Sequence, residues 1–448
     1  MFDFVIRGGT VVTGRHSERA DVGVSEGRIK ELGRIPSGVS DQEIDAACLH
    51  ILPGVIDTQV HFREPGMEHK EDLESGTRAA LHGGVTTIFE MPNTLPTTTT
   101  SSALTDKLNR ANGRAWCNYA FFVGAASDNL EELWELETSE GTPGVKIFVG
   151  SSTGTLLVPD DELLEKVLMR GRYRCPIHSE DHARLMSRSG MLSDPPTVHD
   201  HPHVRDAECA RLATERVLRL SEKTGRPVHI LHLSTADEIP LIEAAKPMGT
   251  TVECTPQHLW FSAPECYDRL GTRAQMNPPL RSVEHRNALR DALKRGFFDV
   301  VGSDHAPHTL EEKSQPYPKS PSGMPGVQTL LPAMLTLAQR DGLLDIQSLV
   351  RLACERPAEI YSIRNKGFIA PGYDADLVLV DLSKRAVFER EMVQSKCGWS
   401  PFEGEEFWGW PITVILGGEV ALSDGERVGQ PAGTVVQFNR ERIPAPRF

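Results

Sequence analysis

Hydrophobic and polar residues follow two different patterns along the chain. In its central part, short apolar runs typical of buried strands are mostly separated by segments with apolar residues at helical spacing. The helical pattern is clearest at 160–173, 205–225 and 283–298. The strands are predicted at 51–62, 85–91, 117–125, 144–150, 175–180, 227–234, 250–256 and 299–305.

Eight strands with mostly helical crossovers predict an α/β fold in which parallel strands close into a (β/α)8 TIM-type barrel. An open doubly wound sheet is the competing arrangement, but no glycine-rich phosphate loop follows the first strand. The two ends of the chain predict short strands and tight turns instead. We therefore expect a barrel over residues 51–369 and a small β-sandwich domain built jointly from residues 1–50 and 370–448.

The composition argues against several kinds of partner. The 448-residue chain has 62 acidic and 48 basic residues and a net charge of -14, which argues against nucleic acid or an anionic membrane. Its eight cysteines form no CxxC pair, which is typical of reduced thiols. The N-terminus does not resemble a signal peptide, and no apolar run approaches the roughly 20 residues that span a bilayer. These features predict a cytoplasmic protein.

Polar residues gather where the predicted strands end. In GVIDTQVHFREPG, residues 54–66, four polar side chains share one face of an extended strand: Asp57, Gln59, His61 and Arg63. The other strands contain or lead into Asn93, Lys146, His178, His232, Gln257, His258 and Asp304. Because the active sites of such barrels lie at the carboxyl ends of the strands, we expect these side chains to converge.

Three histidines, an aspartate and a lysine from five strands form a candidate metal site, because imidazole and carboxylate are ligands suited to zinc and its neighbours. Lys146 is unusual, since it lies in an otherwise apolar strand where an unpaired ammonium is costly. Its side chain either reaches solvent, pairs with Asp304, or is a neutral amine that has captured CO2 to form a carbamate able to bridge two metals. The residues alone leave these alternatives open.

Six segments, in order, resemble the amidohydrolase superfamily and, within it, the dihydroorotases. They are DTQVHFREPG, FEMPNT, VKIFVGSSTG, HSED, HILHLST and GSDHAPH. The combination of HFREPG, MPNT and SDHAPH favours dihydroorotases over the related hydantoinases and allantoinases. The resemblance implies a zinc-dependent hydrolase of cyclic amides, with a small-molecule substrate, that interconverts N-carbamoyl-L-aspartate and L-dihydroorotate in pyrimidine biosynthesis.

The resemblance also implies a binuclear metal centre. His61 and Asp304 would hold one zinc ion, His178 and His232 a second, and carboxylated Lys146 would bridge the two. A hydroxide held between the metals would attack the ring amide carbonyl. Asp304 would take the proton and pass it to the departing nitrogen, which makes it the catalytic residue.

The substrate-binding residues implied by the resemblance form a second group. Arg63, Asn93 and His308 would bind the substrate carboxylate, for which a planar guanidinium offers paired hydrogen bonds. Asn277 would lie near the substrate ring. The structural alternatives are an ion pair between Arg63 and a neighbouring carboxylate, a turn cap for Asn93, and a solvent-exposed loop position for His308.

One position departs from the family pattern, which has H-x-H-x-R where this chain has QVHFR at residues 59–63. A glutamine amide is a much weaker zinc ligand than an imidazole. Three outcomes are open: a weakly bound first metal with Gln59 or water as ligand, a single zinc on the other side of the site, or an inactive relative that serves as a binding partner. Because the other site residues are retained, we favour one firmly bound zinc and a second of partial occupancy.

Two other functional hypotheses stay open, namely a hydrolase of hydantoin or allantoin and a non-catalytic partner protein. The polar, Pro-rich segment 309–323 is predicted to be a mobile loop over the site. The histidine run HDHPH, residues 199–203, is interpreted as a loop before a helix and not as a metal tract. A homodimer is the default expectation for an enzyme of this size.

Overall fold

The computed structural model describes residues 1–150 and 155–440. The last four residues of the motif VKIFVGSSTG, residues 151–154, therefore lie outside the described part, as do residues 441–448 of the expected C-terminal segment. In the described part, no helix is long and apolar enough to cross a membrane.

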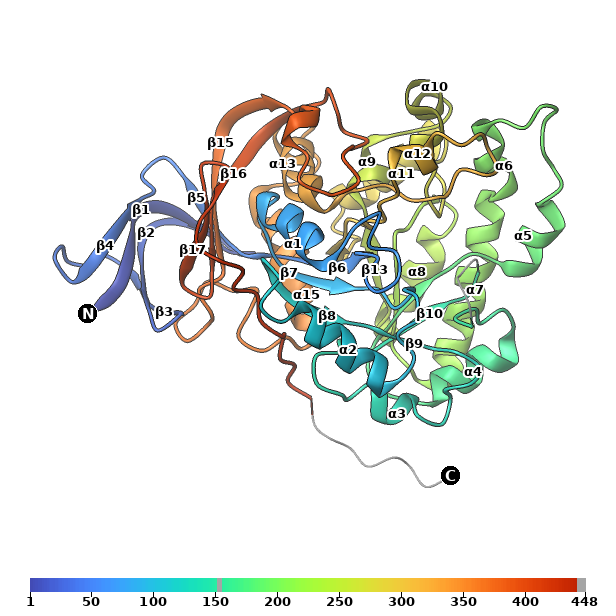
Figure 1. Cartoon of the computed structure of the whole chain (residues 1–448), viewed down its shortest axis with the longest axis horizontal. Helices are drawn as coiled ribbons and strands as arrows, with labels where there is room; N and C mark the ends of the chain where they lie inside the picture. The colour runs from blue at the N-terminus through green and yellow to red at the C-terminus, as the bar shows by residue number, and fades with distance from the viewer. Residues whose placement is uncertain (151–154, 441–448) are drawn as a thin grey trace.

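The barrel expected from the sequence forms the larger part of the molecule (Figure 1). Its strands pair in parallel in the orders β6–β7–β8 and β9–β10–β11–β12–β13–β14, and β8 and β9 share one position because only Phe122 separates them. The circuit closes where Val60 pairs with His305 in a parallel bridge. The barrel strands are β6 (Val55–Val60), β7 (Val85–Glu90), β8 (Asn118–Phe121), β9 (Val123–Gly124), β10 (Val145–Phe148), β11 (Cys175–His178), β12 (Val228–Ile230), β13 (Thr251–Cys254) and β14 (Val300–Val301).

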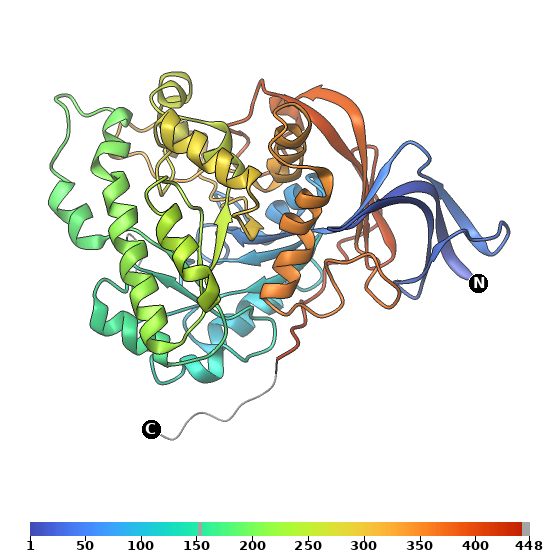
Figure 2. The same cartoon turned by 180° about the vertical axis from the view of Figure 1, so that it is seen from behind.

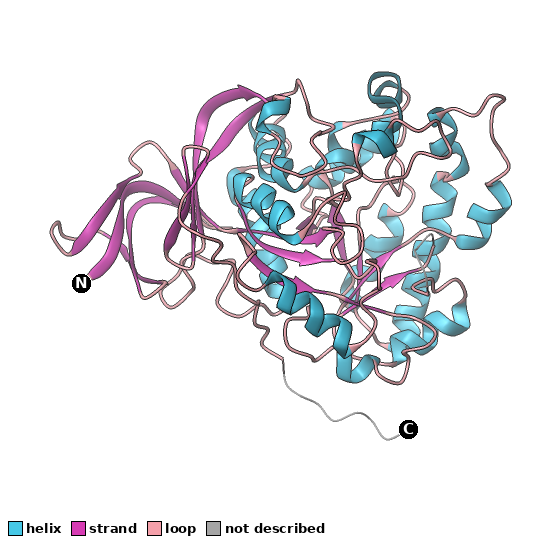
Figure 3. Ribbon diagram, in the orientation of Figure 1, coloured by secondary structure: helices cyan, strands magenta, loops and turns pink. Residues whose placement is uncertain are grey.

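Helices cover the outside of the barrel, as Figures 2 and 3 show. The helix expected at 205–225 illustrates the local signals: the Asp206 side chain caps its first turn, and Gly225, with φ of 71°, ends it. The helices are α1 (Leu73–His82), α2 (Ser101–Ala111), α3 (Leu133–Leu136), α4 (Asp161–Met169), α5 (His182–Arg188), α6 (His201–Val204), α7 (Ala207–Thr224), α8 (Ile239–Ala245), α9 (Pro256–Trp260), α10 (Glu265–Leu270), α11 (Val283–Lys294), α12 (Leu310–Lys313), α13 (Leu330–Gln339), α14 (Ile346–Val350) and α15 (Arg356–Ile360).

Both ends of the chain contribute to one nine-stranded sheet beside the barrel (Figure 1). The order is β18–β17–β16–β15–β5–β1–β2–β3, with β4 also paired to β1, and buried side chains from both ends form a separate hydrophobic core. Residues 433–440 leave this sheet and run along the barrel, where Val435 bridges to Tyr119. The strands are β1 (Phe2–Val12), β2 (Ser17–Ser25), β3 (Arg28–Gly33), β4 (Ser40–Asp45), β5 (His50–Pro53), β15 (Leu377–Val387), β16 (Glu406–Leu416), β17 (Glu419–Ser423) and β18 (Glu426–Arg427).

The single strand predicted at 51–62 is wrong in one respect, because the structure divides it at Gly54. Residues before Gly54 form β5, which pairs with β1 and β15, and residues after it form β6 of the barrel. The Gly54 amide donates to the Asp376 carbonyl at 2.8 Å, and a Cβ at this position would lie 2.0 Å from the Thr86 hydroxyl. The change of sheet therefore needs a residue without a side chain.

Two further segments show local structure that their composition did not predict. The expected loop 309–323 contains α12, capped by Thr309 and Glu312. The HDHPH run forms a 3-10 turn and the short helix α6. His201 Nε2 donates to the Met276 carbonyl at 2.9 Å. The run thus precedes α7 as a structural segment.

A buried ion pair fixes the end of β7. Lys107 of α2 donates to the Glu90 carboxylate and to the Met91 carbonyl, and both side chains are almost fully buried. Lys107→Met should lower the free energy of unfolding by roughly 3–5 kcal/mol, because it leaves the Glu90 carboxylate buried without its partner. Chemical denaturation measures the change, and the double variant E90L/K107M should recover most of it. The matched control is Lys166→Met, whose pair with Glu162 is exposed; equal losses in the two lysine variants would contradict the prediction.

Candidate active site

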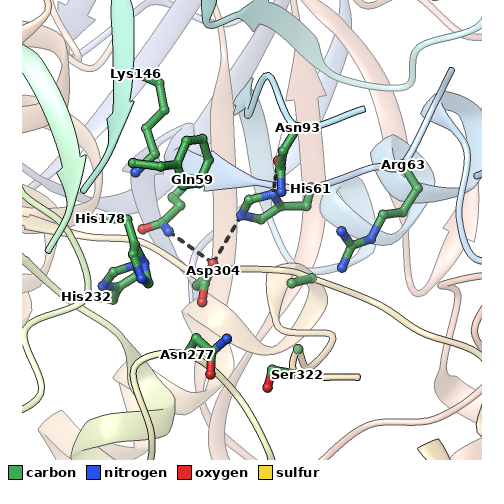
Figure 4. Close-up of a pocket in the computed structure, with 13 residues that line it drawn as sticks. Gln59, His61, Arg63, Asn93, Lys146, His178, His232, Asn277, Asp304 and Ser322 are labelled. Carbon is green, nitrogen blue, oxygen red and sulfur yellow. Dashed lines mark hydrogen bonds and ion pairs between the residues drawn. The ribbon is translucent and has the colours of Figure 1, made fainter. Parts of the chain in front are cut away.

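A polar pocket opens at the carboxyl ends of the barrel strands (Figure 4). The structure brings together nine residues that the sequence singled out: Gln59, His61, Arg63, Asn93, Lys146, His178, His232, Asn277 and Asp304. The tenth, His308, lies directly behind the pocket wall, with its Nε2 3.3 Å from an Arg63 amino nitrogen. Gln257 and His258 are on α9 outside the pocket lining, where they bond to the backbone of Ser303 and Pro278.

Four lining residues were not predicted: Phe148, Ala306, Ser322 and Gly323. Phe148 follows Lys146 by two residues on β10, so strand alternation was a usable signal for it. Ser322 and Gly323 belong to the segment expected over the site, although nothing local marked these two positions.

Three pocket residues have left-handed backbone conformations. The φ angles of Arg63, His232 and Asp304 are 68°, 34° and 45°. Each residue lies two or three positions after the end of its strand. A non-glycine residue in this region costs on the order of 1–3 kcal/mol, which the surrounding structure must offset. The turns aim all three side chains at the mouth of the barrel instead of letting the strands continue.

His178 and His232 face one another across the pocket. His178 Nδ1 and His232 Nε2 lie 3.0 Å apart, and His178 Nε2 lies 3.0 Å from a Glu180 carboxylate oxygen. Burial lowers the pKa of both imidazoles. Burial alone would raise the pKa of Glu180, but Arg205 and His178 hold it at about 2, so this carboxylate is charged. Glu180 therefore accepts the Nε2 proton of His178, and the Nδ1 lone pair of His178 is directed at His232 Nε2, from which it accepts.

His61 and Asp304 form the other side of the pocket. His61 Nδ1 donates to Asn93 Oδ1 at 2.7 Å, which leaves the Nε2 lone pair of a neutral ring 3.3 Å from Asp304 Oδ1. Burial lowers the pKa of His61, although Asp304 opposes the effect. Gln59 Nε2 donates to the same Asp304 oxygen at 3.0 Å, and Gln59 Oε1 is buried without a hydrogen-bond partner among the described residues.

The surroundings of Lys146 contradict two of its three alternatives. The side chain is 1% exposed, and it makes no ion pair or hydrogen bond within the described part of the chain. Its Nζ lies 4.4 Å from the centre of the Phe148 ring. Burial lowers the pKa of this amine well below its ordinary value, despite the charge of Asp304. Lys146 therefore neither reaches solvent nor pairs with Asp304, and a neutral amine is the form that reacts with CO2.

The donor set fits a metal ion only if Lys146 takes part. Across residues 1–150 and 155–440, no three His, Cys, Asp or Glu side chains gather closely enough to hold an ion. Each side of the pocket offers two such groups, His61 with Asp304 and His178 with His232. Tetrahedral zinc with bonds of about 2.0–2.1 Å to nitrogen needs its ligand atoms roughly 3.3 Å apart, close to the separations seen in both pairs. A carbamate on Lys146 would give each pair its third ligand.

Comparison with known proteins agrees with this arrangement. A model of the amidohydrolase family matches residues 50–421. The chain belongs to the amidohydrolase family. Similar curated proteins include the dihydroorotase of Halobacterium salinarum, 36% identical over 95% of this chain and 97% of the relative, and that of Methanosarcina mazei, 34% identical over 90% and 91%. The allantoinase of Rubrobacter xylanophilus is 34% identical over 98% and 99%.

Solved structures confirm the barrel and its small β domain. The L-hydantoinase (dihydropyrimidinase) from Arthrobacter aurescens matches with a TM-score of 0.93 and 27% identity over 98% of this chain and 99% of its own. The dihydropyrimidinase from Brevibacillus agri gives a TM-score of 0.90 and 28% identity over the same shares. Together with the family assignment, these relatives make this amidohydrolase an enzyme that acts on cyclic amides.

Glu180 provides a test of the His178–His232 pair. Glu180→Gln keeps the shape of the side chain but removes the charge that stabilises the Nε2 proton of His178. We expect the affinity for zinc to fall by about 10-fold or more, because carboxylates behind metal-binding histidines typically contribute 10–100-fold. Competition with a chromogenic chelator measures the affinity. Glu162→Gln, a change in an exposed pair, is the control, and an unchanged affinity in Glu180→Gln would refute the role of Glu180.

Proposed function

We propose that this amidohydrolase is a dihydroorotase, which interconverts L-dihydroorotate and N-carbamoyl-L-aspartate. The observation that carries the proposal is the guanidinium of Arg63. It lines the pocket and is 7% exposed, yet it makes no ion pair within the described part of the chain. A buried guanidinium without a carboxylate is costly unless a ligand supplies the anion. Dihydroorotate has such a carboxylate, whereas hydantoin and allantoin do not.

The contacts of Arg63 support a fixed anion site. Arg63 Nε donates to the Pro307 carbonyl at 3.0 Å, which orients the guanidinium plane. Burial lowers the pKa of Arg63 to about 10, so it stays charged at neutral pH. Asn93 uses its oxygen to accept from His61 and has its amide N–H groups left for the substrate carboxylate. Arg63 forms no ion pair with a neighbouring carboxylate of the described residues, so that alternative does not hold. His308 is 7% exposed, so it does not occupy a solvent position.

The reaction adds water to a ring carbonyl carbon and breaks the carbon–nitrogen bond. Asp304 Oδ1 already accepts from Gln59, which leaves Oδ2 to take a proton from the attacking water and deliver it to the departing nitrogen. Asn277 Oδ1 is buried in the pocket without a partner among the described residues, so we assign it to an N–H of the substrate ring.

We propose zinc as the cofactor, held by His178, His232 and a carbamate on Lys146, with His61 and Asp304 binding a second ion more weakly. Zinc supplies Lewis acidity and lowers the pKa of water near it. The neutral imidazoles and the unpartnered amine support this assignment. The eight cysteines are all free thiols, which supports a place in the cytoplasm. A role in pyrimidine synthesis follows from the proposed substrate. We propose that the barrel runs from β6 to residue 369, because residues 51–53, which the sequence assigned to it, pair within the terminal β sheet.

The carboxylate site can be tested with two substrates that differ in one group. Arg63→Met should raise KM for dihydroorotate by about 100-fold, since a buried charged hydrogen bond contributes roughly 2–5 kcal/mol. Hydrolysis of dihydrouracil, the same ring without the carboxylate, should change less than about threefold in kcat/KM. Ultraviolet absorbance follows both reactions. Arg364→Met, far from the pocket lining, is the control. An equal loss on both substrates would refute the assignment and favour a neutral cyclic amide.

Gln59 provides a test of metal content. Wild-type protein loaded with zinc and bicarbonate should retain about one zinc per chain after gel filtration, with partial occupancy of a second, because Gln59 offers no imidazole. Gln59→His should raise the retained zinc toward two per chain. Metal analysis by mass spectrometry gives the ratio, and Gln257→His, a change outside the pocket, is the control. Two firmly bound ions in the wild type would contradict the prediction.

A further inference from the structure

Lys313 is a second buried cation close to the proposed anion site. Its side chain is 1% exposed, and no Asp or Glu of the described part of the chain lies within ion-pair distance of its Nζ. Instead, Nζ donates to the Gln275 carbonyl at 3.0 Å and to the Pro321 carbonyl at 2.8 Å. An ammonium that satisfies backbone carbonyls alone is costly to bury, so the two segments that supply these carbonyls matter for its role.

The two carbonyls belong to two separate walls of the pocket. Gln275 precedes Asn277 by two residues, and Pro321 precedes Ser322 and Gly323. The walls are also joined directly, because the Gly323 amide donates to the Gln275 carbonyl at 2.9 Å. Lys313 therefore binds at the point where these segments meet and ties both of them to α12.

The same helix begins two residues after His308, with Thr309 as its N-cap. The His308 carbonyl accepts from Trp399 Nε1 at 2.8 Å, and the Lys313 Nζ lies 6.0 Å from the centre of the Trp399 ring. Trp399 is fully buried and comes from the connection between β15 and β16. Trp399 therefore contacts both the residue that precedes the capped turn of α12 and the ammonium at the end of that helix.

We propose that Lys313 is a positioning residue for the substrate carboxylate: it fixes the walls that carry Asn277 and Ser322 around the anion, and its charge adds to that of Arg63. The inference rests on the proposed function and deepens it, because it assigns a second cation to the same end of the substrate. Ser322 and Gly323 then define how closely that end of the ring can approach Arg63.

Electrostatics agree with the geometry. Burial, and after it the positive charge of Arg63, lowers the pKa of Lys313 to about 7. A carboxylate bound at Arg63 offsets that repulsion and favours the charged form of the lysine. Gly323 allows this close packing, because it has φ of 142° and a Cβ there would lie 2.3 Å from the Ala306 carbonyl oxygen. In this proposal the bound carboxylate is the anion that both cations face, Arg63 in the pocket and Lys313 behind its walls.

Two variants separate the tether, meaning the hydrogen bonds from Lys313 to the Gln275 and Pro321 carbonyls, from the charge of the ammonium. Lys313→Met removes both the tether and the charge, and Lys313→Gln keeps a hydrogen-bond donor without the charge. For zinc-loaded Lys313→Met we expect KM for dihydroorotate to rise about 10-fold or more, with kcat within about threefold and with dihydrouracil hydrolysis nearly unchanged. Lys313→Gln should give a similar KM effect. The matched control is Lys319→Met, an exposed lysine of the same loop, which should behave as wild type.

Hydrogen exchange gives a readout that does not depend on the reaction. Amides in 272–277 and 309–323 should exchange at least about 10-fold faster in Lys313→Met than in wild type or Lys319→Met, and Lys313→Gln should lie between them. Unchanged exchange would overturn the tether, and an equal loss on both substrates would overturn the role in anion binding. If wild type does not hydrolyse dihydroorotate, the proposed function and the anion role fail together, while exchange still decides the tether.

Discussion

The seam between the first and last barrel strands is the constraint on which the site depends. Asp57 is fully buried and accepts from the backbone amides of Gln59 and Ser303, both at 3.1 Å, so one carboxylate oxygen joins β6 to β14. Beyond it, the His61 amide donates to the His305 carbonyl at 2.7 Å. A parallel barrel must pair every strand with two neighbours. Closing it here also brings His61 within 3.3 Å of Asp304, although 243 positions separate them in the chain.

At the carboxyl end of this barrel, the protein leaves several buried polar groups without protein partners. They include the amine of Lys146 and the amide oxygens of Gln59 and Asn277, which have no hydrogen-bond partner among the described residues. By contrast, the buried amine of Lys107 is matched by Glu90. An unmatched buried polar group costs free energy, and these three line one pocket together with the guanidinium of Arg63, an arrangement that fits the proposed metal ion and anionic substrate.

The parts of the fold that depend on local periodicity could be predicted from the sequence. The helix α7 follows the apolar spacing at 205–225, and the polar residues after each strand converge because parallel strands end on one side. The division of the first strand at Gly54 could not be predicted from the sequence, because it depends on the approach of Thr86 from another strand. Glu180 and Arg205 form an ion pair although 25 positions separate them in the chain. The path of residues 309–323 depends on the hydrogen bond from Lys313 to the distant Gln275 carbonyl. Such contacts leave no periodic signal.

The glutamine at position 59 makes physical sense on this background. A histidine there would place a second imidazole, a stronger zinc ligand than an amide, beside Asp304 and His61. Gln59 presents an N–H donor instead and satisfies Asp304 without a metal. The opposite pair keeps its imidazoles, its charged Glu180 and access to Lys146. The glutamine therefore makes the two sides of the pocket unequal: one side offers two imidazoles, and the other offers one imidazole, a carboxylate and an amide.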